Sequence, residues 1–103
     1  MRRGEVWWAR LPAPAGMRPV LLLTRDRALE VRQSATVVQV TRTVRGIPTE
    51  VPLGPEEGLP KPCVANADVL LTIPKSLLAE RICALSPEKM QAVGRAVRFA
   101  LAL

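Results

Sequence analysis

The sequence contains no histidine and no tyrosine, and its aromatic side chains are limited to two tryptophans and one phenylalanine. Without histidine, the chain lacks the side chain most often used for acid–base catalysis and for zinc binding near neutral pH. Any chemistry must therefore come from arginine, lysine, aspartate, glutamate, serine or threonine. We expect no metal ion and no cofactor.

Cysteine is also scarce, and Cys63 and Cys83 match no metal-ligand spacing and stand in apolar surroundings. This pattern favours buried, unpaired thiols in a reducing cytosol over a disulfide. No apolar run approaches the ~18 residues that cross a membrane. Met1-Arg2-Arg3 is followed by Gly4-Glu5 and not by an apolar segment, so we expect no signal peptide. We expect a cytoplasmic protein with no membrane partner.

Acidic residues are few beside basic ones, with nine Asp and Glu against fifteen Lys and Arg. The formal net charge is +6 and the sequence pI is about 10.7, which indicates a polyanionic partner such as nucleic acid. The 103 residues, 49% of them hydrophobic, predict a single domain over residues 1–103.

The most informative stretch is an unbroken apolar run, Val20 to Leu23, which has no polar face. Such a run predicts a strand buried on both faces, and Pro19 suits the first residue of that strand because it lacks an N–H donor. Arg18 would then stand at the rim of the core, where its guanidinium can be held in one place. The alternative is that Arg18 is an ordinary surface cation of a basic protein.

Before this run, Glu5 to Leu11 predicts a strand that carries Trp7 on one face and Trp8 on the other. Each tryptophan could stack on a nucleic-acid base, or it could belong to the core or to a dimer interface. The segment Pro12 to Gly16 holds two prolines and a glycine, so it predicts a loop directly before the central strand.

The segment Thr24 to Ser34 predicts a loop with a single helical turn, in which Leu29 and Val31 are the apolar contacts. Further strands are predicted at Ala35 to Val40, which should pair with the central strand, at the edge segment Thr49 to Leu53 with its Pro52, and at the start of Cys63 to Thr72. Gly54 to Pro62 and Ile73 to Ser76 predict breaks, and Leu77 to Leu85 fits a helix or a strand.

The clearest element is a C-terminal helix, with Ser86 as N-cap, Pro87 at the first position and Glu88 in the first turn. Its apolar stripe is expected at Met90, Val93, Val97 and Leu101, with Arg95 and Arg98 off the stripe. These elements predict a mainly β fold with a C-terminal helix, a small, strongly curved β-barrel.

Polar side chains gather at two further places. The segment Thr41 to Gly46 carries hydroxyls and cations at the end of a predicted strand, among them Arg42, Thr43 and Arg45. Asn66 and Asp68 share one face of their strand. If the sheet curls, both of these side chains would look into the same cleft as Arg18.

Several short blocks together resemble the MazF/PemK family of toxin endoribonucleases from type II toxin–antitoxin systems, whose fold is shared with the gyrase poison CcdB. The blocks run in the family's order over nearly the whole chain: Arg3 to Trp8, Arg18 to Leu23, Pro48 to Leu53 with Gly58-Leu59, Asn66 to Asp68, Thr72 to Ser76, and Leu85 to Met90.

The resemblance implies an SH3-like barrel, a homodimer, and metal-independent cleavage of single-stranded RNA at short motifs. It also implies a cognate antitoxin with an acidic, disordered C-terminal segment, and DNA binding by the toxin–antitoxin complex. The family's catalytic pair corresponds to Arg18 and Thr41, and an RNA-binding aspartate corresponds to Asp68. Some relatives carry acidic or histidine residues in the loop before the arginine, whereas Pro12 to Met17 has neither.

The site predicted from this sequence therefore has Arg18 and Thr41 as catalytic residues. Its predicted RNA contacts are Arg42, Thr43, Arg45, Asn66 and Asp68. Two other classes of function remain open. One is a barrel that inhibits DNA gyrase or binds nucleic acid without cutting it, and the other is a small interaction module whose charge holds an acidic partner.

Overall fold

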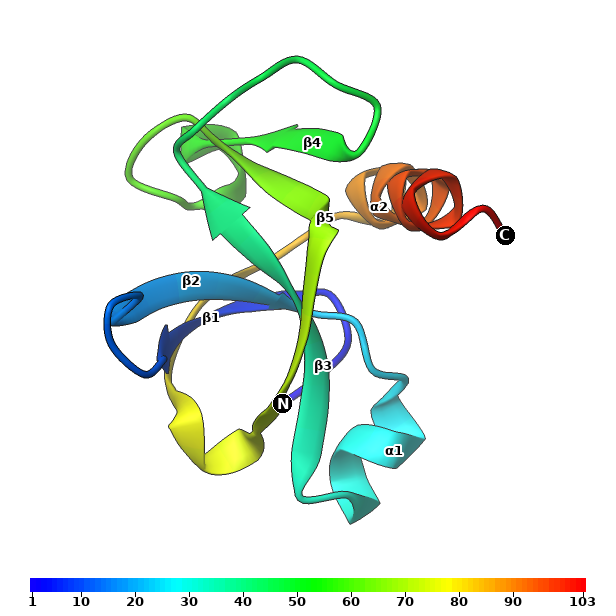
Figure 1. Ribbon diagram of the computed structural model, residues 1–103. Helices are drawn as coiled ribbons and strands as arrows, with labels where there is room; N and C mark the ends of the chain where they lie inside the picture. The colour runs from blue at the N-terminus through cyan, green and yellow to red at the C-terminus, as the bar shows by residue number, and fades with distance from the viewer.

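A computed structural model describes residues 1–103 as one curled antiparallel sheet with a long helix at the C-terminal end (Figure 1). Its elements, in chain order, are β1 (Glu5–Arg10), β2 (Met17–Leu22), α1 (Asp26–Val31), β3 (Ser34–Thr41), β4 (Glu50–Leu53), the 3-10 turn η1 (Pro55–Glu57), β5 (Cys63–Pro74), the 3-10 turn η2 (Lys75–Leu77), β6 (Leu78–Ala84) and α2 (Pro87–Leu101). The six strands lie in the order β4-β5-β3-β2-β1-β6. This confirms the mainly β fold with a C-terminal helix, in the form of a half-barrel.

The two faces of the sheet bury different apolar clusters. One cluster lies under α2 and includes Leu21, Val38 and Val93, and the other lies under α1 and includes Val20 and Leu29. Val20, Leu21 and Leu22 have no exposed surface, because alternate residues of β2 enter the two clusters. The sequence prediction of a strand buried on both faces is therefore confirmed.

The central strand begins earlier than predicted, since β2 starts at Met17 and Pro19 lies inside it. Pro19 is opposite Trp8 of β1, whereas pairing of β2 with β3 begins only at Val20. The missing N–H of Pro19 therefore breaks no ladder on the β3 side. Arg18 is consequently part of the strand and close to its free end.

The segment after β2 was predicted as a loop with one helical turn, and the structure instead forms the six-residue helix α1. Leu29 is buried as expected, but Val31 is 63% exposed. Val31 follows Leu29 by two residues, and on a helix this separation places the two side chains more than half a turn apart. Val31 therefore points away from the face that buries Leu29.

Two other predictions along the chain change in detail. The break expected at Ile73 to Ser76 begins later, because Ile73 pairs with Ala35 and is buried within β5. The segment Leu77 to Leu85, which fitted a helix or a strand, forms β6 at the edge of the sheet beside β1. The other edge is β4, where the exposed Pro52 lies as predicted.

The C-terminal helix α2 begins as the sequence predicts, with the Ser86 hydroxyl accepting a hydrogen bond from the Lys89 amide at 3.2 Å. Val93 and Ala96 are its buried residues, whereas Leu101 is 52% exposed, so the predicted stripe is wrong at its last position. The apolar end of α2 projects beyond the sheet (Figure 1).

Candidate functional site

A cleft of about 350 Å³ opens where β2 begins and β3 ends. Its walls come from β1, β2, the end of β3, the turn after η1 and the start of β5, that is, from residues Trp8, Met17, Arg18, Pro19, Val40, Thr41, Arg42, Thr43, Leu59, Pro60, Lys61 and Cys63. The antiparallel order β3-β2-β1 brings these chain segments to one end of the sheet. The cleft contains three cations and no carboxylate.

Arg18 is held by the proline-rich loop that precedes β2. Its Nε donates a hydrogen bond to the carbonyl oxygen of Ala15 at 3.0 Å. This bond uses Nε and leaves both terminal NH₂ groups of the guanidinium available for a ligand. Arg18 is therefore an exposed cation, but one whose guanidinium is held in place by the loop at the wall of the cleft.

Thr41 ends β3 and faces the same cleft, so the two residues of the predicted catalytic pair lie in one site. The Thr41 hydroxyl accepts a hydrogen bond from the Thr43 amide at 3.2 Å. This bond orients the hydroxyl and leaves its hydrogen available to a ligand. Arg42 and Thr43, two of the predicted RNA contacts, also line the cleft.

Arg45 lies in the same loop but not on the cleft wall. The Glu50 carboxylate accepts hydrogen bonds from the amides of Arg45, at 3.0 and 3.1 Å, and of Gly46, at 2.8 Å. Gly46 has φ of +71°, a conformation that glycine adopts without strain. Glu50 therefore organises the loop that follows Thr43.

Asn66 and Asp68 do not line the cleft, so the expectation that they share it with Arg18 is wrong. The pairing of β5 with β3 jumps from Asn66 to Leu70, which leaves Asp68 in a bulge. The Asp68 carboxylate accepts a hydrogen bond from the Thr49 hydroxyl at 2.8 Å. The Asn66 side chain is buried and accepts one from the Asp68 amide at 3.0 Å. The bulge lets the Asp68 side chain reach Thr49, next to β4, while Asn66 holds the Asp68 backbone.

Sequence reasoning missed Lys61, which adds a third cation to the cleft from the turn after η1. The turn depends on Gly58, whose φ is +105° and whose added Cβ would lie 3.1 Å from the Cys83 Cβ. Nothing in the sequence distinguishes Lys61 from the other cations, because the shape of the loop decides where it points.

The two tryptophans have different surroundings. Trp8, a possible stacking residue, lies on the cleft wall, whereas Trp7 packs on the cluster under α1.

Cys63 also lines the cleft, but burial and the nearby charge of Glu57 raise the pKa of its thiol. A neutral thiol is a poor nucleophile, so the groups left for chemistry are guanidinium, ammonium and hydroxyl. No three His, Cys, Asp or Glu side chains gather where they could hold a metal ion. None of the helices is long and apolar enough to cross a membrane.

A half-barrel whose cleft offers cations and hydroxyls but no carboxylate defines a small β protein suited to holding a polyanion. Residues 2–101 match the family model described as PemK-like, MazF-like toxin of type II toxin-antitoxin system, and the chain belongs to this family.

Known relatives cover almost the whole chain. It is 40% identical over 99 residues to the probable endoribonuclease MazF2 of Mycobacterium tuberculosis, with 95% of each chain covered. It is 35% identical over 100 residues to the probable endoribonuclease MazF5 of the same organism, with 96% of this chain and 91% of the relative covered.

Among solved structures, the Mycobacterium tuberculosis toxin MazF-mt6 matches with a TM-score of 0.89 at 35% identity, over 96% of this chain and 97% of that one. An endoribonuclease in complex with its cognate antitoxin, from a mycobacterial species, matches with a TM-score of 0.89 at 29% identity, over 100% and 96% of the two chains.

Proposed function

We propose that this chain is the toxin of a toxin–antitoxin system and that it cuts single-stranded RNA at short motifs, in the cytoplasm, without a metal ion. The main observation behind the proposal is that Arg18 and Thr41 line the same cationic cleft. The endoribonuclease names of relatives at 35–40% identity support it. The buried free thiols Cys63 and Cys83 are compatible with a reducing compartment.

The reaction uses a nucleophile that RNA itself carries. The 2′-oxygen attacks the adjacent phosphorus in line and loses its proton, while the bond from phosphorus to the 5′-oxygen breaks and that oxygen gains a proton. The products are a 2′,3′-cyclic phosphate and a 5′-hydroxyl end. The protein has to hold the strand open, neutralise the growing charge on the phosphoryl oxygens and assist the two proton transfers.

Arg18 is assigned to the phosphoryl oxygens. Its terminal NH₂ groups can donate two parallel hydrogen bonds to phosphate, since Nε is already engaged by Ala15. Thr41 donates its hydroxyl hydrogen to the same phosphate, with the Thr43 amide fixing its orientation. Removing one such preorganised donor typically lowers the rate by about 10²–10³.

The other cleft residues hold the strand. Arg42, Thr43 and Lys61 contact phosphates and sugars, and Trp8 offers a face on which an unstacked base can lie. Arg45 and Asp68 are proposed to contact nucleotides beyond the cleft, and Asn66 holds the backbone of Asp68 in place.

The proposal includes the assembly expected of such a toxin. The chain forms a homodimer and is inhibited by a cognate antitoxin whose acidic, disordered segment orders as it binds across the cationic cleft. The toxin–antitoxin complex binds DNA. The mycobacterial endoribonuclease solved with its cognate antitoxin supports this arrangement.

The test is to incubate the purified protein with a long single-stranded RNA in excess EDTA and to map the fragment ends. We expect discrete fragments with cyclic phosphate and 5′-hydroxyl ends. An RNA with 2′-deoxyribose at the mapped cut site should bind but resist cleavage, because its nucleophile is gone. Tight RNA binding without any cut would contradict the proposal and favour a binding protein. Inhibition of DNA gyrase without RNA cleavage would favour a gyrase poison.

A further inference from the structure

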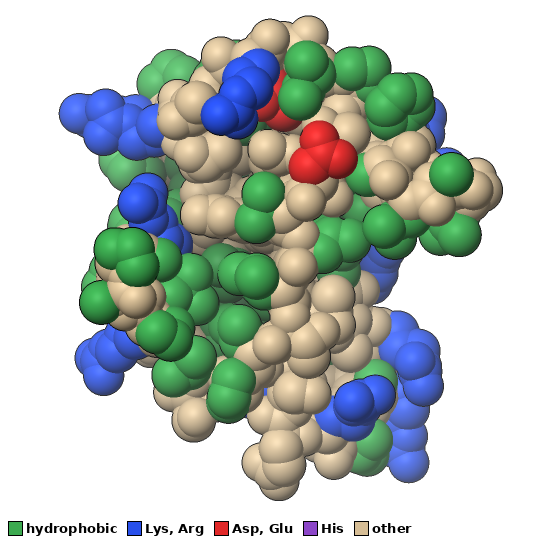
Figure 2. All heavy atoms as spheres, in the orientation of Figure 1, with side chains coloured by type: hydrophobic (Ala, Val, Ile, Leu, Met, Phe, Trp, Pro, Cys, Tyr) green, Lys and Arg blue, Asp and Glu red, His purple; other side chains and the backbone are tan.

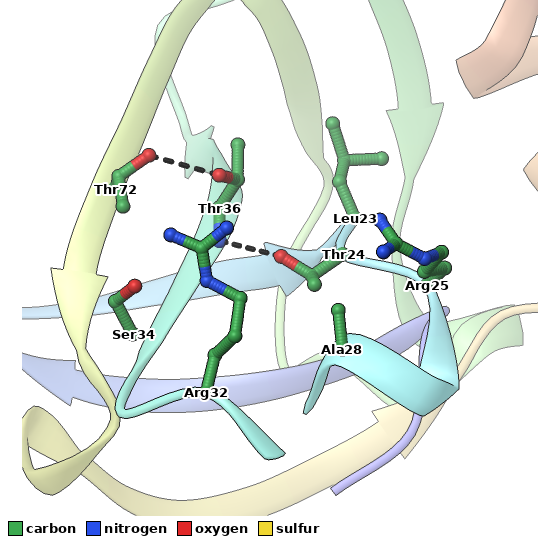
Figure 3. Close-up of a pocket in the computed structure, with 8 residues that line it drawn as sticks. All are labelled: Leu23, Thr24, Arg25, Ala28, Arg32, Ser34, Thr36 and Thr72. Carbon is green, nitrogen blue, oxygen red and sulfur yellow. Dashed lines mark hydrogen bonds between the residues drawn. The ribbon is translucent and has the colours of Figure 1, made fainter. Parts of the chain in front are cut away.

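A second pocket, of about 320 Å³, lies at the far end of β2 from Arg18 and has no lining residue in common with the cleft. Its lining side chains are drawn in Figure 3. It is enclosed by the end of β2 and the residues after it, by α1, and by the facing ends of β3 and β5. The residues that line it are Leu23, Thr24, Arg25, Ala28, Arg32, Ser34, Thr36 and Thr72.

Two arginines supply the charge of this pocket. Arg32 extends from the segment before β3 toward Thr36 and Thr72, while Arg25 enters from the start of α1 (Figure 3). Neither guanidinium makes an ion pair or a hydrogen bond within the protein. Arg27 lies within α1 and is different, because it forms an ion pair with Glu30 at 3.3 Å and does not line the pocket.

The other polar groups of the pocket are hydroxyls, some of whose oxygens already accept hydrogen bonds within the protein. The Thr24 hydroxyl accepts a hydrogen bond from the Thr36 amide at 2.7 Å, and the Thr36 and Thr72 hydroxyls share one at 2.8 Å. Thr24 and the Thr36–Thr72 pair therefore each keep a hydrogen to donate, and Ser34 adds another hydroxyl. The pocket is rich in donors.

These donors define the kind of ligand. No carboxylate lines the pocket, so a cation has no partner there, and no aromatic ring lines it, so a nucleobase has no surface on which to stack. Guanidinium groups with adjacent hydroxyls match the oxygens of a phosphate. A free phosphate would gain little from two exposed arginines, whereas a phosphate on a strand already held elsewhere binds at high effective concentration.

The position of the pocket fits such a second contact. Pro19 of the cleft lies in β2, and Leu23 of the pocket comes four residues later, directly after the end of β2, where its amide donates a hydrogen bond to the Thr36 carbonyl oxygen at 2.9 Å. Val40 of the cleft and Thr36 of the pocket are likewise four residues apart along β3. Four strand residues span roughly 13 Å, and residues of the same parity share a face. We propose that this pocket binds a phosphate of the RNA strand several nucleotides from the bond that is cut, an inference that rests on the proposed function.

The test compares Arg25→Gln/Arg32→Gln with Arg27→Gln/Arg10→Gln, a control of equal net charge whose residues line neither the pocket nor the cleft. Two RNAs with 2′-deoxyribose at the cut site are used, a short one that covers only the cleft and a long one with flanking nucleotides. In Arg25→Gln/Arg32→Gln, the pocket variant, we expect the affinity for the long RNA divided by the affinity for the short RNA to fall about tenfold. The slope of log affinity for the long RNA against log salt concentration should decrease in magnitude by about 0.7, because one phosphate contact is lost. The control should keep the parental ratio.

If the pocket variant lost equal affinity for the long and the short RNA, or if the control variant showed the same fall in the affinity ratio, the proposal would be overturned. The arginines would then act only through the general positive charge of the protein. Weaker binding of an acidic antitoxin peptide, with an unchanged RNA ratio, would overturn it in favour of a protein partner. NMR gives a readout that does not depend on RNA cleavage. The long RNA should shift the signals of the Thr36 and Thr72 amides in the parental protein, whereas the short RNA should not, and neither RNA should shift them in Arg25→Gln/Arg32→Gln. Bound long RNA that leaves both signals unshifted in the parental protein would reject the pocket while leaving the proposed function standing.

Discussion

At the scale of single residues, Arg18 stands out because it lines the cleft and a hydrogen bond from its Nε to the Ala15 carbonyl oxygen holds it there. Arg18→Ala should lower the cleavage rate by about 10²–10³ while RNA affinity changes much less, because it is one of fifteen cations. Arg18→Lys should lose nearly as much, since an ammonium keeps the charge but not the planar pair of donors. Arg10→Ala, at an exposed position outside the cleft, is the control. Single-turnover cleavage gives the rates, and a parental rate for Arg18→Ala would refute the mechanism.

The two cleft threonines provide a matched pair. Thr41→Val removes a hydroxyl with little change in shape and should slow cleavage less than Arg18→Ala, because the guanidinium remains. Thr43→Val should have a smaller effect, since the contribution of Thr43 to orienting Thr41 comes from its backbone amide, which valine retains. Cleavage rates measured with saturating RNA decide the order. Equal losses in the two variants would show that Thr41 has no special role.

The sequence could predict site residues that lie in a strand or directly after its end. Arg18 was singled out by its place before an apolar run, Arg42 and Thr43 by the polar cluster that follows β3, and Thr41 by the resemblance to the toxin family. Lys61 depends on the path of a turn, and its place in the cleft has no sequence signature. Asp68 was misplaced because a bulge, which alternation of side chains does not reveal, interrupts the pairing of β5 with β3.

At the scale of elements, Glu5 ties the first and last strands of the chain together. Its carboxylate accepts hydrogen bonds from the Trp7 indole at 3.0 Å, the Arg2 amide at 2.9 Å and Arg81 of β6 at 2.9 Å. Burial acts to raise the pKa of Glu5, but these bonds outweigh burial and hold the pKa below the ordinary value of 4.5. Because Glu5 is held ionised in the folded state, its contribution to stability is present above pH 4.5 and is lost as the pH falls through its lower folded pKa.

Glu5→Gln should therefore lower the free energy of unfolding by about 1–2 kcal/mol at neutral pH, since hydrogen bonds to a charged group are replaced by neutral ones. The difference from the parental protein should shrink as the pH falls below 4.5. Urea unfolding followed by circular dichroism over a pH series measures it. The control is Glu80→Gln on exposed β6 surface, and a difference that grows toward acid would contradict the assignment.

A helix or strand could be predicted where its apolar residues fit only the helical or only the strand period and where the sequence marks its first or last residue. The helix α2 has an N-cap serine, a proline at its first position and a helical stripe, and its start was correct. The helix α1 was underestimated because its six residues contain only three apolar ones, of which Ala28 and Leu29 are buried. The segment of β6 fits either period, and only its pairing with β1 makes it a strand.

At the scale of the whole molecule, apolar surface is left at the C-terminal end. Phe99, Leu101 and Leu103 are 62%, 52% and 82% exposed, and Phe99 borders a groove between α2 and β4. We expect this end to be covered in a homodimer. Light scattering should give about twice the 11.2 kDa mass of the chain at micromolar concentration. Phe99→Ser should shift the equilibrium to monomer, whereas Val31→Ser, which changes an equally exposed side chain on α1, should not. A concentration-independent monomer would refute the expectation.

The charge of the molecule is poorly compensated from within. Only Arg27 and Arg81 of the fifteen Lys and Arg side chains form ion pairs. Several carboxylates are engaged by backbone amides instead, among them Asp26, Glu50 and Glu57. On the face drawn in Figure 2, Lys and Arg side chains surround the outline and acidic side chains are sparse. A positive field of this kind attracts an acidic chain from a distance and is screened by salt.

This leads to a prediction for the antitoxin. A peptide with the acidic C-terminal segment should bind across the cleft and block RNA cleavage, and its affinity should fall steeply between low and high ionic strength. Arg42→Gln/Lys61→Gln should weaken the peptide and reduce that salt dependence, because both cations line the cleft. The control is Arg10→Gln/Arg27→Gln, which removes the same charge elsewhere. Titration calorimetry at several salt concentrations measures the affinities. Binding that is insensitive to salt, or an equal loss in the control, would show that the charge of the cleft does not recruit the antitoxin.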